Sequence, residues 1–149
     1  MPIRCEIVSQ DRMVFEGDAD IVTLPGTDGE MGILPHHSPL LTTLQFGFVT
    51  IRSKDKEEVF AVAGGIAEVQ PDLVTILADS AENVEEIDIS RAEAARRRAE
   101  EFLAQGTPAD TDSYLRLEAA LRRSNLRLDA VRRFRRTTKK SRYSDSESR

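Results

Sequence analysis

The sequence is poor in cysteine and in aromatic residues. Its 149 residues include one cysteine, no tryptophan and two tyrosines. A single cysteine excludes a disulfide framework and a cysteine-based zinc site. No apolar run approaches the roughly 18 residues that a membrane-spanning helix needs. Because 32% of the residues are charged, the composition indicates a globular protein.

Features of secreted proteins and of enzymes are also missing. The stretch Met1–Glu6 lacks the apolar core of a signal peptide, so we expect a chain that stays in a reducing cytosol, with Cys5 as a core thiol. His36 and His37 are adjacent, so their side chains diverge, and we expect no metal site there. There is no phosphate-binding glycine loop and no nucleophile elbow. The sequence therefore predicts no catalytic residues.

The charges are divided unevenly along the chain. Residues 1–90 contain five Lys and Arg against 17 Asp and Glu, whereas residues 91–149 contain 16 against nine. This asymmetry predicts two parts with different partners. The acidic part is not expected to bind nucleic acid or an anionic membrane surface, and the basic part is suited to a polyanion or an acidic protein surface.

Residues 1–86 have the pattern of an all-β domain. Apolar residues alternate with polar ones, as in Ile3–Ile7, and turn signals such as Gly64-Gly65 recur every eight to 12 residues. This spacing is typical of a two-sheet sandwich or a barrel of about eight to ten strands. The segment Pro25–Pro39 has no periodicity, so we expect a functional loop there, with Met31 exposed at its tip.

Residues 87–136 predict a two-helix hairpin. Ser90 and Glu93 have the spacing of a capping box and Asp88 lies just upstream, so a helix should begin at residues 89–91. It should end at Gly106–Pro108, and Asp110 or Thr111 should cap a second helix. That helix has an apolar stripe with steps of three and four, suited to one partner helix: Tyr114, Leu117, Leu121, Ser124, Leu128 and Val131. Residues 137–149 are polar and serine-rich, and we expect them to be disordered.

Four arginines are expected to converge on the hairpin. If the chain folds back about Pro108, Arg91 lies opposite the pair Arg123 and Arg127, and Arg98 lies two turns from Arg91. Guanidinium groups suit phosphate because their planar fork binds it in a bidentate way. A solvated basic face explains the same spacing without a ligand, and spacing alone favours that explanation.

Three motifs, taken together, resemble the ε subunit of F-type ATP synthases. They are Gly29–Leu41 (GEMGILPHHSPLL), Gly64–Pro71 followed by Val74–Asp79, and Ile87–Ala92 (IDISRA). The resemblance extends over residues 3–135. It implies an N-terminal β-sandwich of about ten strands followed by a C-terminal antiparallel helical hairpin.

The resemblance also implies a non-catalytic rotor subunit that requires no cofactor. In this family the sandwich holds the foot of the γ subunit and rests on the membrane c-ring, on the cytoplasmic face of the energy-transducing membrane and without inserting into it. The positions that match the c-ring-facing loop are Glu30, Met31 and Gly32, and those that match the γ-facing region are His37 and Ser38. The hairpin either folds on the sandwich or extends along γ and blocks ATP hydrolysis, with its basic second helix facing acidic loops of the catalytic β subunits.

The motif Ile87–Ala92 further resembles the regulatory ATP-binding motif of some ε subunits, which makes ATP a candidate regulatory ligand. The matching positions are Glu82, Asp88, Arg91, Arg98, Arg123 and Arg127. An alternative is a free-standing nucleotide sensor outside any ATPase, which would purify alone. A nucleic-acid-binding module is less favoured, because both tyrosines are C-terminal and the acidic part offers no aromatic stacking platform.

Overall fold

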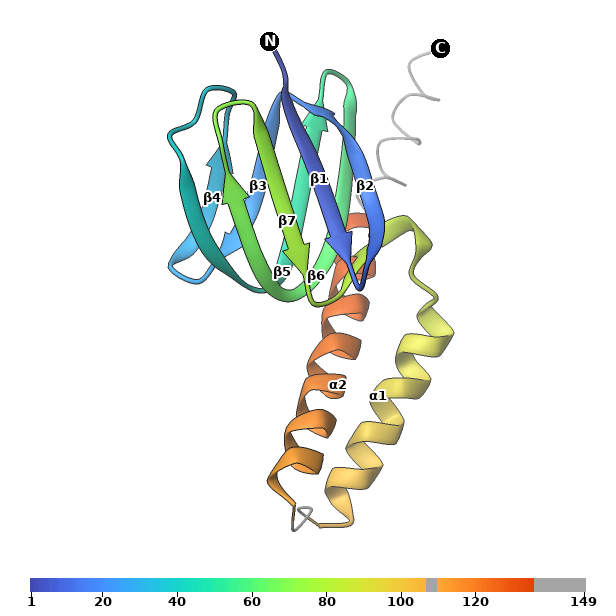
Figure 1. The fold of residues 1–149 in the computed structure, drawn as a ribbon. Helices are drawn as coiled ribbons and strands as arrows, with labels where there is room; N and C mark the ends of the chain where they lie inside the picture. Colours follow the sequence, from blue (N-terminus) through green and yellow to red (C-terminus); the bar gives the residue numbers. More distant parts are fainter. Residues whose placement is uncertain (107–109, 136–149) are drawn as a thin grey trace, which may run out of the picture. The chain divides into compact units, whose positions relative to one another are not determined.

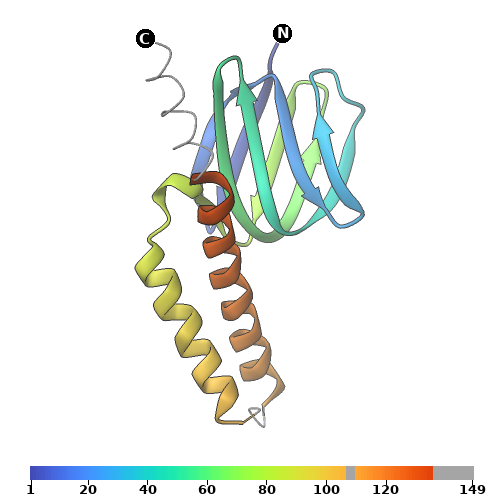
Figure 2. The same ribbon diagram turned by 180° about the vertical axis from the view of Figure 1, so that it is seen from behind.

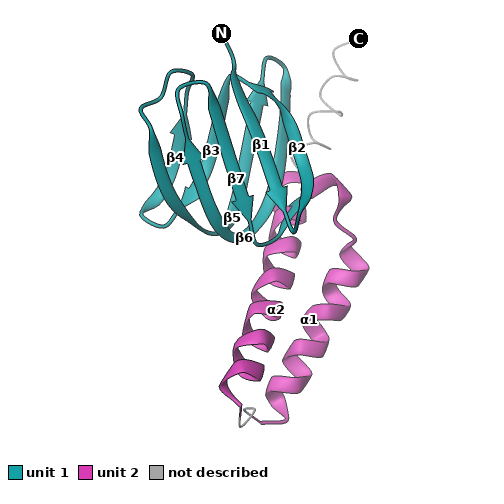
Figure 3. Cartoon of the chain, viewed as in Figure 1, with its two compact units in different colours: residues 1–83 teal, residues 84–149 magenta. Residues whose placement is uncertain are grey.

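The computed structural model describes residues 1–106 and 110–135. The chain divides into two compact units, Met1–Asn83 and Val84–Arg149 (Figure 3). The sequence places the boundary after Glu86. Pro108, Arg136 and the predicted disordered tail 137–149 lie outside the described residues.

The first unit is a β-sandwich built from a single curled sheet (Figures 1 and 2). Its strand order is β2-β1-β7-β6-β5-β3-β4, with β8 paired to β6. Every pair is antiparallel except β1 and β7, which run parallel. The strands are β1 Ile3–Ser9, β2 Arg12–Ala19, β3 Ile21–Gly26, β4 Gly29–Ile33, β5 Leu40–Ser53, β6 Lys56–Val69, β7 Leu73–Ala78 and β8 Ala81–Asn83.

The predicted sandwich is confirmed, with eight strands rather than about ten. The difference arises in β6, which runs for 14 residues straight through Gly64-Gly65, where the sequence suggests a turn. Both glycines have positive φ, +84° and +127°, a conformation that glycine adopts without strain. A Cβ at Gly65 would also collide with the carbonyl oxygen of Leu77. The glycines therefore bend one long strand so that it serves both layers.

The core lies between the two layers. Large apolar side chains from both layers are fully buried in one cluster, including Ile7, Val22, Phe60 and Ile76. The rings of Phe15 and Phe60 pack at 5.6 Å between centroids and are tilted by 59°, an arrangement that aromatic pairs favour. At about 25 cal/mol per Å² of buried apolar surface, this cluster is the main source of stability of the unit.

The expected long loop is for the most part a β-hairpin. Strands β3 and β4 pair antiparallel from Val22–Ile33 to Gly26–Gly29. Met31 lies within β4, half-buried and packed against the core, so the prediction that it is exposed at a loop tip is wrong. Met31 and Ile33 do alternate with Glu30 and Gly32, but the many Gly and Pro residues of this segment favoured a loop. Only residues 34–39 connect β4 to β5 without a strand.

The second unit is the predicted pair of helices. A 3₁₀ turn, η1 (Val84–Glu86), precedes α1 (Ile89–Ala104), and α2 (Thr111–Ala130) continues into the π-helical turn η2 (Val131–Arg135). The N-cap of α1 is Asp88, whose Oδ1 accepts the backbone N–H of Arg91 at 3.1 Å. Ser90 lies inside the helix, so the capping box suggested by the sequence is not formed. Asp110 caps α2, as one of the two predicted alternatives.

The helices pack through small side chains. Ala92 and Ala99 are the buried residues of α1, and Ser124 and Ala130 are those of α2. The Ser124 hydroxyl donates to the carbonyl oxygen of Ala120 at 3.0 Å, which satisfies the hydroxyl within its own helix. We call the predicted apolar stripe, from Tyr114 to Val131, the seam of α2. Its members other than Ser124 are half-buried. Alanines bury little area, so the fully buried part of the interface between α1 and α2 is small.

Candidate functional site

One outer face of the sandwich carries a row of residues from five neighbouring strands. The strand registers place Met13 beside Val8, Val8 beside Leu77, Leu77 beside Ile66, and Ile66 beside Thr43. Residues directly opposite each other on paired strands project to the same side of a sheet. Four of these five side chains are therefore apolar and project together.

This row is open to solvent. The exposed fractions are 48% for Met13, 47% for Leu77 and 39% for Ile66. Leu41, two residues before Thr43 on the same face of β5, is 68% exposed. We call Met13, Leu41, Ile66 and Leu77 the apolar face. Single exposed apolar residues are common on proteins, but a contiguous set indicates a surface for a partner.

A groove lies next to the apolar face. Its lining consists of Pro39, Leu40, Leu41, Glu68, Val69, Gln70 and Pro71. The loop before β5 is tied to this groove, because the backbone N–H of His36 donates to the carbonyl oxygen of Pro71 at 2.8 Å. Two predicted γ-facing residues, His37 and Ser38, lie between that bond and Pro39, and His37 Nδ1 is 2.7 Å from the Ser38 carbonyl oxygen.

The three predicted c-ring residues occupy β4. Glu30 pairs with Pro25 of β3, and Gly32 pairs with Thr23. Glu30 and Gly32 are exposed, while Met31 between them packs against the core. Of the three, therefore, Glu30 is the side chain that this edge of the sandwich presents to solvent.

Three of the four predicted arginines border one edge of the helical hairpin. Arg91, Arg98 and Arg123 each come one residue before a buried residue, namely Ala92, Ala99 and Ser124. In an antiparallel pair of helices, a residue that comes one position before a packed residue lies on the same edge of the pair whichever helix it belongs to. Arg127 follows Arg123 by one turn and is half-buried.

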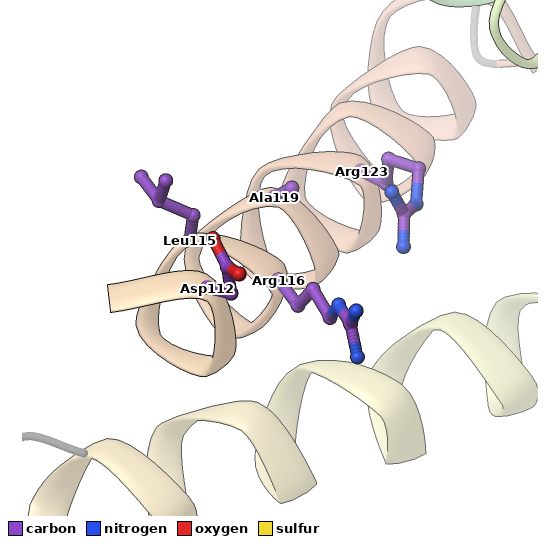
Figure 4. Close-up of a pocket in the computed structure, with 5 residues that line it drawn as sticks. All are labelled: Asp112, Leu115, Arg116, Ala119 and Arg123. Carbon is purple, nitrogen blue, oxygen red and sulfur yellow. The ribbon is translucent and has the colours of Figure 1, made fainter. Parts of the chain in front are cut away.

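A shallow groove on α2 includes Arg123 and also Arg116, which is not among the predicted site residues. It is lined by Asp112, Leu115, Arg116, Ala119 and Arg123. Figure 4 shows the guanidinium groups of Arg116 and Arg123 extending from α2 to the side on which α1 lies. Arg116 precedes Arg123 by seven residues, so the heptad spacing was the signal that could have identified it.

The two acidic residues predicted for the ATP site, Glu82 and Asp88, lie in different parts of the structure. The carboxylate of Asp88 caps α1, and Glu82 lies in β8 of the first unit, opposite Ala61. At the start of α2, the hydroxyl of Ser113 and the backbone N–H of Asp112 donate to Asp110 and hold the pKa of its carboxyl group below the usual value. Asp110, like Asp88, thus acts as a helix cap.

The described residues hold no metal cluster or membrane-spanning helix. Within residues 1–106 and 110–135, no three His, Cys, Asp or Glu side chains gather closely enough to hold a metal ion. None of the helices in this part of the chain is both long and apolar enough to cross a membrane. Cys5 is buried, and its burial, with a smaller contribution from Glu6, raises the pKa of its thiol to about 12.

The two units match two family descriptions in the same order. Residues 2–84 match the β-sandwich domain of the ATP synthase delta/epsilon chain, and residues 85–132 match its long α-helix domain. The chain belongs to the ATP synthase delta/epsilon family. As an ε-type chain, it is a structural or regulatory subunit in the central stalk of an ATP synthase.

Individual relatives agree with this assignment over most of the chain. An ATP synthase epsilon chain of Dehalococcoides mccartyi is 43% identical over 139 residues, covering 89% of this chain and 94% of the relative. One from Herpetosiphon aurantiacus is 45% identical over 132 residues, covering 89% and 96%. One from Pelotomaculum thermopropionicum is 51% identical over 104 residues, covering 70% and 78%.

A solved structure supports the fold. A chain in the mitochondrial ATP synthase of Euglena gracilis, from a structure of its OSCP, F1 and c-ring, aligns with a TM-score of 0.71 and 24% identity. The alignment covers 87% of this chain and 81% of that chain. At this identity the similarity establishes the arrangement of a sandwich followed by helices.

Proposed function

We propose that this ε-type chain couples the c-ring to γ through its sandwich, and that the apolar face is the surface that holds γ. The observation that carries the proposal is the exposed set Met13, Leu41, Ile66 and Leu77, which continues into the groove beginning at Pro39. Exposed apolar area of this kind is stabilised when a partner removes it from water. In this proposal the chain itself lies on the cytoplasmic face of the membrane, as a peripheral subunit of the complex.

The surroundings of the apolar face favour a protein partner with a basic rim. Glu68 lies beside Leu41 in the register of β5 and β6, and Glu6 lies beside Thr75 in the register of β1 and β7. Both carboxylates therefore border the apolar row. Acidic side chains around an apolar centre repel an anionic membrane and attract Lys or Arg of a partner protein.

The experiment that tests this proposal measures binding of the purified chain to purified γ. Replacing a centrally placed apolar residue by a carboxylate, as in Leu77→Asp or Ile66→Asp, should weaken binding at least about tenfold, because the charge would have to be desolvated in the interface. Thr50→Asp is the matched control, since Thr50 projects outward from the other layer, beside Thr23 and Val59. Equal affinity of all three variants would contradict the proposal.

The helical unit is proposed to regulate ATP hydrolysis, with ATP as its regulatory ligand. The support is its small packed interface, which lets the helices separate at low cost, and the arginines that border one edge. An extended α2, with Arg116, Arg123 and Arg127 on its surface, has the charge to bind the acidic loops of catalytic β subunits. Binding of a nucleotide phosphate at the same arginines would hold the hairpin closed, because it would bridge the two helices.

A further inference from the structure

The seam of α2 ends on an arginine. Counting onward from Val131 by four, the next position is Arg135, the last described residue of η2. Its side chain is half-buried rather than solvated. The first residue of α1 is Ile89, and α1 does not extend as far as η2. The turn η1, which precedes α1, contacts η2 instead.

The guanidinium group of Arg135 closes the base of the hairpin. Its Nη2 donates to the carbonyl oxygens of Val84, Glu85 and Ile87, at 2.9, 3.0 and 2.6 Å. This nitrogen carries two hydrogens, so one of them is shared between two oxygens. Bonds from a charged donor are shorter and stronger than neutral ones, and the contact to Ile87 is the shortest of the three.

The accepting carbonyls lie outside the hydrogen-bond ladder of α1. They precede the N-cap Asp88, so α1 gives them no intrahelical partner. The carbonyl of Val84 also accepts a long bond of 3.4 Å from the backbone N–H of Ile87. Losing Arg135 would remove a hydrogen-bond donor from the part-buried carbonyls of Val84 and Ile87, which costs more than the loss of a solvent-exposed bond.

We propose that Arg135 is a positioning residue that latches the hairpin shut. It ties the residues that lead into α1 to the end of α2, across 51 positions of sequence. The helices cannot separate along their length while this contact holds. The latch supplies the closing force that the buried alanines of α1 do not, and breaking it is the first step of opening.

The inference deepens the regulatory role proposed above and rests on it only for its consequence in the complex. A side chain that merely stabilised the fold would, on removal, give a disordered hairpin and weaker inhibition of ATP hydrolysis. A latch gives the opposite sign, because its removal leaves the helices formed and free to extend. The two roles therefore differ in the direction of the effect on hydrolysis.

The closed state is measured first, by amide hydrogen exchange in the full chain. In Arg135→Gln, exchange in residues 84–92 and 124–135 should be at least about tenfold faster than in the wild type. Arg132→Gln is the matched control, because it removes the same charge from an exposed position of the same turn and should change exchange less than about twofold. Residues 1–83 serve as the internal reference.

A charge-conserving variant guards against simple unfolding. Arg135→Lys keeps the positive charge and three N–H donors on a stem that is one atom shorter, so it should restore part of the protection lost in Arg135→Gln. Exchange in Arg135→Gln no faster than in Arg132→Gln would overturn the latch. So would an Arg135→Lys variant as unprotected as Arg135→Gln.

The consequence is then measured as inhibition of ATP hydrolysis by the reconstituted complex. Arg135→Gln should inhibit more strongly than the wild type at equal subunit concentration. Weaker inhibition, with fast exchange throughout both helices, would overturn the latch in favour of a purely structural role. Faster exchange at the hairpin base with unchanged inhibition would leave the latch in place and contradict the regulatory function of the hairpin.

Discussion

At the scale of single residues, burial decides what each polar or reactive group can do. Cys5 is fully buried between Ile3 and Ile7 on the core side of β1. Its sequence pattern was sufficient to predict this, because inward positions alternate along a half-buried strand. Met31 was mispredicted, because the Gly and Pro residues of Pro25–Pro39 favoured a loop, and its contact with the core could be seen only in the structure.

The thiol of Cys5 should make the chain less stable at alkaline pH. Its pKa is raised to about 12 in the folded chain, whereas an unfolded thiol ionises near pH 8.5. The folded state therefore keeps a proton that the unfolded state loses. Between these two pKa values the free energy of unfolding should fall by about 1.4 kcal/mol per pH unit from this group, and the full contribution is present only below them.

Urea unfolding of the wild type and of Cys5→Ala, measured from pH 8 to pH 10.5, isolates this contribution. The alanine variant should be less stable at pH 8 but should lose stability less steeply as the pH rises. Parallel pH profiles would show that the thiol is not protected. A thiol reagent should likewise react with the native wild type only at the rate of unfolding.

Glu30 gives the cleanest residue-scale test of the c-ring contact. Because Met31 packs against the core, a charge at Met31 would damage the sandwich as well as any interface. Glu30→Arg changes an exposed side chain and should weaken association of the chain with the membrane sector at least about tenfold if this edge faces the c-ring. Asp28→Arg, on the neighbouring turn, tests whether the effect belongs to Glu30 or to the general charge of this edge.

At the scale of elements, the local sequence predicts where the helices begin and end better than it predicts the bounds of the strands. The bounds of α1 and α2 follow from Asp88, Gly106 and Asp110, whose preferences act within a few residues. The seam follows from a heptad-like spacing. By contrast, Gly64-Gly65 lies inside a continuous strand where Leu77 and Asp79 approach so closely that a side chain would collide, and no local pattern reveals this approach.

The cap of α1 separates a structural role of Asp88 from a ligand-binding one. Asp88→Ala removes the acceptor for the Arg91 N–H and should destabilise the hairpin by about 1 kcal/mol, whereas Asp88→Asn keeps an equivalent cap. Hydrogen exchange in the first turn of α1 measures this difference. Equal protection in the two variants would contradict the capping role.

The arginine edge of the hairpin is tested by calorimetry with ATP. The wild type should bind at millimolar nucleotide or below, and Arg91→Gln and Arg123→Gln should each abolish detectable binding, because each removes a guanidinium group from the same edge. Arg132→Gln should bind as the wild type does. Absence of a binding signal from the wild type at millimolar ATP would rule out the site.

At the scale of the whole molecule, the two units differ in charge and in exposed apolar surface, and different roles are proposed for them. The acidic sandwich offers the apolar face and Glu30, and the basic helices offer the arginine edge and the latch. The charge asymmetry and the order of the two parts were readable from the sequence. The apolar face was not, because Met13, Ile66 and Leu77 come from separate strands and only the sheet registers bring them together.

The central claim is that this chain works inside a rotary ATP synthase, held between γ and the c-ring. The most direct measurement is affinity purification of the tagged chain from mildly solubilised membranes, followed by identification of what accompanies it. We predict recovery of γ, the catalytic subunits and the c subunit in constant proportion, and their loss with the Leu77→Asp variant. Purification of the wild-type chain alone would contradict the account and favour a free-standing nucleotide sensor.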